Sequence, residues 1–124
     1  MNDAPVRVLA LVPELLTSVR IESGVQRLGG FLQVAETPQE FFAVLHESPP
    51  DLAVIDLGLD WVDLDEVVQA ATLARTPLLA FGPHVDMRAL RRARDAGVEF
   101  VVPRSKFLSD VTGTLREALS GARA

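Results

Sequence analysis

The sequence predicts one α/β domain over residues 1–124, a three-layer sandwich of (βα)5 type around a five-stranded parallel sheet. Three observations predict this fold class. A chain of 124 residues suits a single domain. Hydrophobic residues make up 48% of the chain and charged residues 23%, which is ordinary for a folded protein with a real core. Short apolar, β-branched runs alternate with longer segments whose apolar residues recur at helical spacing.

The expected strands are apolar runs without the alternation of half-exposed strands, as in a sheet covered on both faces. Val6–Val12 is interrupted only by Arg7, and Leu52–Ile55 has no break. Alternation with helices predicts parallel pairing through right-handed crossovers and leaves the strand order open. The strands are expected near residues 6–12, 31–35, 51–57, 77–81 and 99–102.

Capping signals mark where the first three helices begin. Pro13 suits the first turn of a helix that extends to Leu28. Thr37-Pro38-Gln39-Glu40 combines a capping box with a proline at the first helical position. Asp63 and Glu66 repeat the capping spacing before the next apolar stripe.

The last two helices are predicted from their apolar spacing. Met87, Leu90 and Ala93 are expected to face inward on a helix that Gly97 ends. The final helix is expected to be continuous, with Ser105 as its cap. Its apolar residues recur four apart, at Phe107, Val111, Leu115 and Leu119.

Composition excludes several classes of function. The chain has no cysteine, so a disulfide framework, a cysteine-ligated metal and a cysteine nucleophile are excluded. The only two histidines, His46 and His84, are far apart in the sequence, which argues against a histidine-rich metal site. A net charge of −5 disfavours non-specific binding to nucleic acid or anionic membranes. With no secretory signal pattern and no membrane-length apolar run, we expect a cytoplasmic protein without direct nucleic-acid or membrane partners.

Candidate pocket residues come from the topology, because ligands of open α/β sheets bind beyond the carboxyl ends of the strands. The phosphate-cradling patterns G-x-x-x-x-G-K-[ST] and G-x-G-x-x-G and the nucleophile pattern G-x-S-x-G are absent. His84 fits either a pocket or a solvated loop. The pocket candidates at the strand ends are Glu14, Asp56, Asp60, Gly82, His84, Arg104 and Lys106.

The run Asp51-Leu52-Ala53-Val54-Ile55-Asp56-Leu57 resembles the third strand of response regulator receiver (CheY-like) domains. That strand ends on the aspartate that accepts a phosphoryl group, and Asp56 falls on this position. The resemblance covers nearly the whole chain, including Val6–Val12, Pro77–Phe81 and Ala93–Phe100. It implies a flavodoxin-like fold and a bacterial, cytoplasmic protein of two-component, phosphorelay signal transduction.

Most of the family's chemical groups are replaced in this chain. The resemblance implies an acidic pair that holds Mg²⁺, a serine or threonine, and a lysine, all acting around the acceptor aspartate. On the simplest register these positions are Val12-Pro13, Gly82 and Pro103, so only Asp56 is kept. We therefore expect a degenerate receiver (a pseudo-receiver) with no cofactor and no catalytic residues, which is not an enzyme and acts through protein partners.

Two alternatives stay open. Arg104 or Lys106 could supply the missing cation, with Mg²⁺ held by Asp56 and Glu14 or Asp60, so that Asp56 is still phosphorylated in a single-domain response regulator. The strand-end pocket could instead bind a small molecule or an anion as a sensor. Convergence of these carboxylates and cations at Asp56 would favour phosphorylation. Filling of the space by Trp61 or Phe81 would favour an interaction module, in which Asp56 caps the next loop or forms a permanent salt bridge.

The charged helix faces suggest where a partner could bind. Arginines gather on the predicted helix near residues 87–96, and the preceding helix opens with acidic residues. Faces of opposite sign fit a protein partner or a homodimer, and they equally fit solvated helix surfaces. Trp61 fits either an interface anchor or the local core. The candidate interface residues are Trp61, Arg88, Arg91 and Arg92.

Overall fold

The computed structural model describes residues 5–59, 62–83 and 85–123, which form a five-stranded parallel sheet. Its strand order is β2-β1-β3-β4-β5, which puts β1 and β3 side by side at the centre. The predicted (βα)5 three-layer architecture is therefore confirmed. The strands are β1 (Arg7–Leu11), β2 (Phe31–Val34), β3 (Leu52–Asp56), β4 (Leu78–Gly82) and β5 (Phe100–Pro103).

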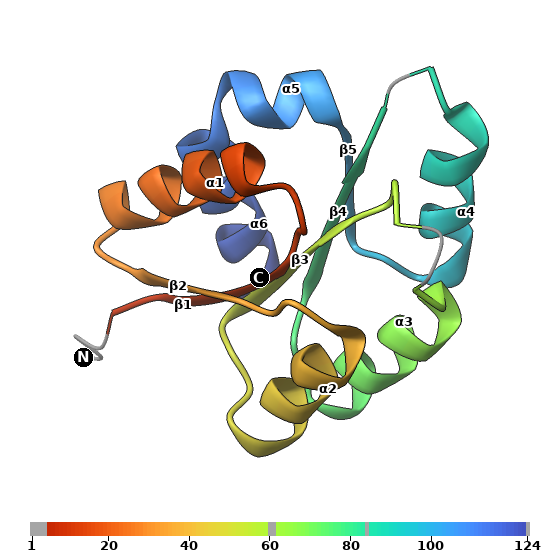
Figure 1. Cartoon of the computed structure of the whole chain (residues 1–124), viewed down its shortest axis with the longest axis horizontal. Helices are drawn as coiled ribbons and strands as arrows, with labels where there is room; N and C mark the ends of the chain where they lie inside the picture. The colour runs from red at the N-terminus through yellow and green to blue at the C-terminus, as the bar shows by residue number, and fades with distance from the viewer. Residues whose placement is uncertain (1–4, 60–61, 84, 124) are drawn as a thin grey trace.

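Helices cover both faces of the sheet, as Figure 1 shows. One layer consists of α1 (Leu15–Arg27), α5 (Arg104–Ser109) and α6 (Val111–Arg123). The other layer consists of α2 (Pro38–Glu47), α3 (Leu64–Leu73) and α4 (Met87–Ala96). Among the described residues, no helix combines the length and hydrophobicity that crossing a bilayer requires.

The alternating side chains of β1 divide the core into two clusters. Val8 and Ala10 pack under α1 and α6, whereas Leu9 and Leu11 pack under α2 and α3. All four are buried. Burial of a leucine-sized side chain stabilises the fold by about 1.5 to 3 kcal/mol. This explains why the strands read as unbroken apolar runs.

The predicted caps of α2 and α3 and the predicted end of α4 are confirmed. The Thr37 hydroxyl oxygen accepts a hydrogen bond from the Glu40 backbone N–H at 3.1 Å. The Asp63 carboxylate accepts from the backbone N–H groups of the first turn of α3, including that of Glu66 at 3.3 Å. Gly97 ends α4 with a φ of 105°, a left-handed conformation that favours glycine.

The prediction of one continuous final helix is wrong. The helix is interrupted at Asp110, which lies between α5 and α6 and has a φ of −152°. The Asp110 carboxylate accepts a hydrogen bond from the backbone N–H of Gly113 at 2.9 Å and thereby caps α6. Ser105, the expected cap, lies inside α5, which begins at Arg104.

Two smaller predictions about helix faces also need correction. Pro13 does not lie in the first turn of α1, because Glu14 is extended at the N-cap position and the helix begins at Leu15. Met87 does not face inward. As the first residue of α4 it is exposed, while Leu90 and Ala93 carry the buried stripe.

Candidate functional site

The carboxyl ends of three strands bring the predicted pocket residues to one edge of the sheet. Asp56 is the last residue of β3 and pairs in register with Phe81 of β4. The chain beyond β1 leads to Glu14, and the chain beyond β5 leads to Arg104 at the start of α5. Because all strands are parallel, these three positions lie at the same end of the molecule.

The Arg104 guanidinium joins two carboxylates. Its Nη2 lies 2.6 Å from Glu14 Oε1, and its Nη1 lies 3.5 Å from Asp56 Oδ2. Nη2 also donates a hydrogen bond to the Thr17 hydroxyl oxygen at 2.5 Å. The guanidinium carbon is 5.6 Å from the centroid of the Phe81 ring, which is within cation–π range. We call these five residues the Arg104 cluster.

The two carboxylates of the Arg104 cluster differ in exposure. The Asp56 side chain is 11% exposed and that of Arg104 is 30% exposed, whereas the Glu14 side chain is 58% exposed. Arg104 therefore supplies the counter-charge to a largely buried aspartate. Glu14 holds the outer side of the guanidinium.

Hydrogen bonding keeps Glu14 ionised. The Thr17 hydroxyl donates a hydrogen bond to the Glu14 carboxylate, and this bond lowers the pKa of that carboxyl. Partial desolvation raises the same pKa, while the charge and the hydrogen bond of Arg104 lower it, so the net direction is down. An ionised Glu14 strengthens its pairing with Arg104.

The second oxygen of Asp56 is occupied by the following loop. Asp56 Oδ1 accepts a hydrogen bond from the backbone N–H of Gly58 at 2.8 Å. This is the loop cap that the sequence suggested as one role of Asp56. With Oδ1 on the loop and Oδ2 facing Arg104, both carboxylate oxygens have partners.

Gly82 occupies a position where a side chain has little room. A Cβ atom on Gly82 would lie 3.2 Å from the Leu57 Cβ and 3.8 Å from the Leu90 Cδ2. The first distance is tighter than ordinary van der Waals contact. The apolar neighbours have thus filled the space at this strand end, where the family resemblance expects a hydroxyl.

The described side chains at this edge do not fit Mg²⁺ as they are arranged. In the described part of the chain, no group of three or more histidine, aspartate or glutamate side chains could hold a metal ion. Glu14 and Asp56 are two suitable carboxylates, but both contact the guanidinium of Arg104. Because a guanidinium stays charged at all relevant pH values, it repels a divalent cation from the space between them.

The other predicted residues that the structure describes do not join the cluster. Lys106 lies on α5, and neither ion pair among the described residues includes it. Arg88, Arg91 and Arg92 are exposed on α4, and Arg92 lines a cavity of about 300 Å³ together with Asp56. The predictions for Asp60, Trp61 and His84 fall outside the described residues.

Sequence reasoning missed Thr17. It lies three residues after Glu14 on the first turn of α1, and residues at this spacing share a helix face. The three-residue spacing could have predicted that Thr17 lies near Glu14. The contact between Thr17 and Arg104 could not be predicted from local spacing, because the two residues are 87 positions apart in the sequence.

Comparisons with known proteins identify the fold. No family model and no curated protein matches the chain in sequence. A response regulator from Thermotoga maritima superposes with a TM-score of 0.81 and 16% identity, covering 94% of this chain and 99% of that one. A CheY-like receiver domain protein from Methanospirillum hungatei gives a TM-score of 0.80 and 16% identity, covering 97% and 98%. The fold is that of a response-regulator receiver domain.

In this receiver fold, the structure meets one of the two conditions that would separate the functional alternatives. Glu14 and Arg104 converge on Asp56, which favours phosphorylation. Phe81 is fully buried beneath the Arg104 guanidinium and packs against Phe107, while a cavity of about 300 Å³ stays open beside Asp56. The arrangement of charges within the cluster therefore carries the argument about function.

Proposed function

We propose that this chain is a pseudo-receiver, a signalling module that acts through protein contacts in the bacterial cytoplasm without Mg²⁺-dependent phosphorylation of Asp56. The observation that carries the proposal is the position of Arg104, 2.6 Å from Glu14 and 3.5 Å from Asp56. The guanidinium takes the place between the carboxylates that a metal ion would need. The module needs no cofactor and has no catalytic residue.

Electrostatics support a permanently unphosphorylated site. An aspartyl phosphate at position 56 would carry roughly −1.5 to −2 charge in place of the carboxylate's −1. Arg104 is the one cation that pairs with Asp56 among the described residues, and it is already shared with Glu14. Gly82 has no hydroxyl to move toward a phosphoryl group.

The α4 surface is the proposed contact region for a protein partner. Arg88, Arg91 and Arg92 are exposed, and in the described chain neither ion pair includes them. Met87 at the start of the same helix and Val85 just before it are large, exposed apolar residues. A basic surface with an apolar border suits an acidic protein surface.

Treatment with a small-molecule phosphodonor and Mg²⁺, followed by intact mass measurement, tests the proposal. We expect no added phosphoryl group in the wild-type chain or in Asp56→Asn. A Mg²⁺-dependent gain of one phosphoryl mass that disappears in Asp56→Asn would show that the proposed function is wrong. Repeating the wild-type reaction with Mg²⁺ chelated separates metal-dependent transfer from non-specific modification.

A second candidate function is phosphorylation at Asp56, and it is supported by the same contacts of Arg104 with Glu14 and Asp56. The Arg104–Asp56 distance of 3.5 Å is long for a hydrogen bond, so Arg104 could turn toward phosphoryl oxygens instead. This candidate predicts that Arg104→Ala abolishes a gain in mass seen with the wild-type chain. The pseudo-receiver predicts no gain to abolish.

A further inference from the structure

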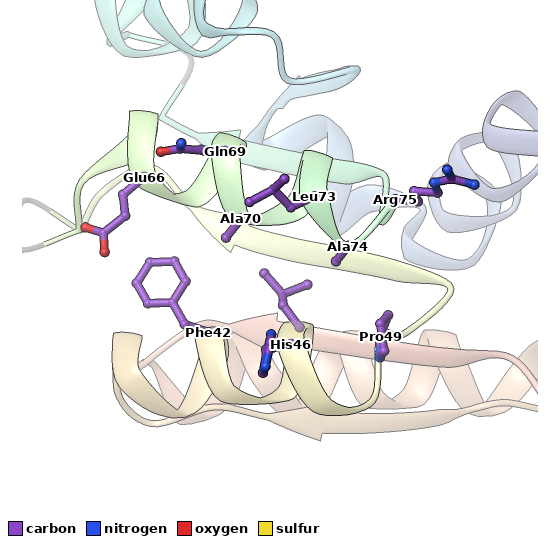
Figure 2. Close-up of a pocket in the computed structure, with 10 residues that line it drawn as sticks. Phe42, His46, Pro49, Glu66, Gln69, Ala70, Leu73, Ala74 and Arg75 are labelled. Carbon is purple, nitrogen blue, oxygen red and sulfur yellow. The ribbon is translucent and has the colours of Figure 1, made fainter.

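A groove with a volume of about 550 Å³ lies between α2 and α3. Figure 2 shows the two helices side by side, with Phe42 rising from α2 toward the facing side of α3. Asp56 does not line this groove. The apolar lining residues are Phe42, Leu45, Pro49, Ala70, Leu73 and Ala74.

Leu73 stands out on the rim of the groove. It lines the cavity, yet its own exposure is 80%. A leucine in water forgoes the free energy that it would gain in an apolar site. The same face thus carries an apolar hollow and an apolar side chain of a size that can fill it.

Charges of opposite sign lie at the two ends of the groove. Glu66 lies at one end and Arg75 at the other, as Figure 2 shows. Asp63 and Asp65 add negative charge near Glu66, and His46 lines the groove on α2. Glu66 lies in the first turn of α3, and Arg75 lies just past the C-cap residue of the same helix.

We propose that this groove is an interface for a second copy of this chain, paired by a two-fold axis with the two α3 helices antiparallel. A two-fold contact needs a surface that complements itself. The antiparallel arrangement places Leu73 of each copy over the groove of the other. It also brings the Glu66 end of one copy opposite the Arg75 end of its partner.

The proposal does not rest on the proposed function, because the groove lies between α2 and α3 and shares no residue with the Arg104 cluster. Two short helices per copy make a contact below the size of a standard interface, so we expect reversible dimers in the micromolar range. The net charge of −5 per copy opposes association at low salt.

Sedimentation equilibrium of the full chain, from low micromolar to near-millimolar concentration, tests the proposal. We expect Leu73→Gln to raise the dimer dissociation constant by about tenfold or more, because each dimer loses two leucine contacts. Leu73 is exposed, so the variant should fold, which circular dichroism would verify. Leu16→Gln is the matched control, since Leu16 is 75% exposed on α1 outside the groove.

Charge reversal provides a second and independent test. Glu66→Arg and Arg75→Glu should each weaken the dimer, and the double variant should restore it, because the opposing ends are exchanged together. Glu117→Arg, at an exposed position of α6, controls for the change in net charge. A wild-type chain that stays monomeric to near-millimolar concentration would mean that the groove takes a different occupant, and the proposal would be overturned. A dimer insensitive to Leu73→Gln, or a double variant as weak as the singles, would overturn it equally.

Discussion

Replacement of Arg104 by alanine tests the central contact of the site. Both ion pairs in the described residues include this side chain. Without it, Asp56 would keep its loop hydrogen bond to Gly58 but lose its counter-charge while 11% exposed. Phe81 would lose the guanidinium above its ring. We therefore expect Arg104→Ala to destabilise the fold.

The magnitude follows from the geometry. Unit charges 3.5 Å apart attract by about 5 kcal/mol at an effective dielectric constant of about 20. Desolvation and lost side-chain entropy offset most of this attraction, which leaves about 1 to 2 kcal/mol for a partly buried pair. The cation–π contact with Phe81 adds about 0.5 to 1 kcal/mol. Arg104→Ala should thus lower the free energy of unfolding by about 2 kcal/mol.

A double-mutant cycle with urea unfolding isolates the Arg104–Asp56 part. Arg104→Ala, Asp56→Asn and the double variant should show a coupling free energy of about 1 kcal/mol. Asp56→Asn retains an oxygen that can accept from Gly58, so the loop cap is preserved. Arg88→Ala, an exposed position on α4, should change stability by less than about 0.5 kcal/mol. Coupling below about 0.3 kcal/mol would refute the claim that Arg104 neutralises Asp56.

Two further predictions address the neighbours of Arg104. The lowered pKa of Glu14 means that between this pKa and the ordinary value of 4.5 the unfolded chain binds more protons than the folded one. The stabilisation that ionised Glu14 provides is therefore complete above pH 4.5 and is lost as the pH falls through the lowered pKa. In urea unfolding, the difference in stability between wild type and Glu14→Gln should disappear over that pH range. A difference that stays constant with pH would contradict this prediction. Gly82→Thr should cost about 1 to 3 kcal/mol in thermal unfolding, because its Cβ would crowd Leu57. Adding Leu57→Ala should reduce that cost, and a neutral Gly82→Thr would show that the space is open.

The strands could be predicted because burial on both faces of the sheet requires continuous runs of apolar residues, which are visible in the sequence. The run predicted at residues 51–57 contains β3, which occupies Leu52–Asp56. Strand order cannot be predicted in the same way, because a fully buried apolar strand can pair equally well with any other such strand. The position of β1 beside β3 therefore had to come from the structure.

The final helix shows a limit of apolar periodicity. Phe107 of α5 and Leu115 of α6 are both fully buried in the same cluster, although the helix is interrupted between them at Asp110. Periodic spacing reports which residues face the core, and it does not report whether the backbone between them is continuous. The break could have been suspected from Asp110 itself, since aspartate is a favoured N-cap residue.

At the site, the sequence provided the candidates but not their pairing. Asp56, Glu14 and Arg104 were all predicted at strand ends, and the structure brings them together. Periodicity could not separate Arg104 from Lys106 as the cation. The choice depends on where α5 begins, and because Arg104 is its first residue, Arg104 lies nearest to the end of β5.

The replacements at the site form a consistent electrostatic set. Once Val12 and Pro13 supply no metal ligands, a largely buried Asp56 needs another cation, and Arg104 provides it. The carboxylates of Glu14 and Asp56 with the guanidinium of Arg104 leave one net negative charge, which the protein can hold at a partly exposed edge. An aspartyl phosphate would carry roughly −1.5 to −2 in place of the carboxylate's −1, which makes the net charge of the cluster roughly −1.5 to −2, with no further cation from the described residues paired to it. Arg104 balances the unphosphorylated site to one net negative charge, whereas the extra charge of an aspartyl phosphate would have to share the same guanidinium with Glu14. This charge balance is the electrostatic basis of our proposal that Asp56 stays unphosphorylated.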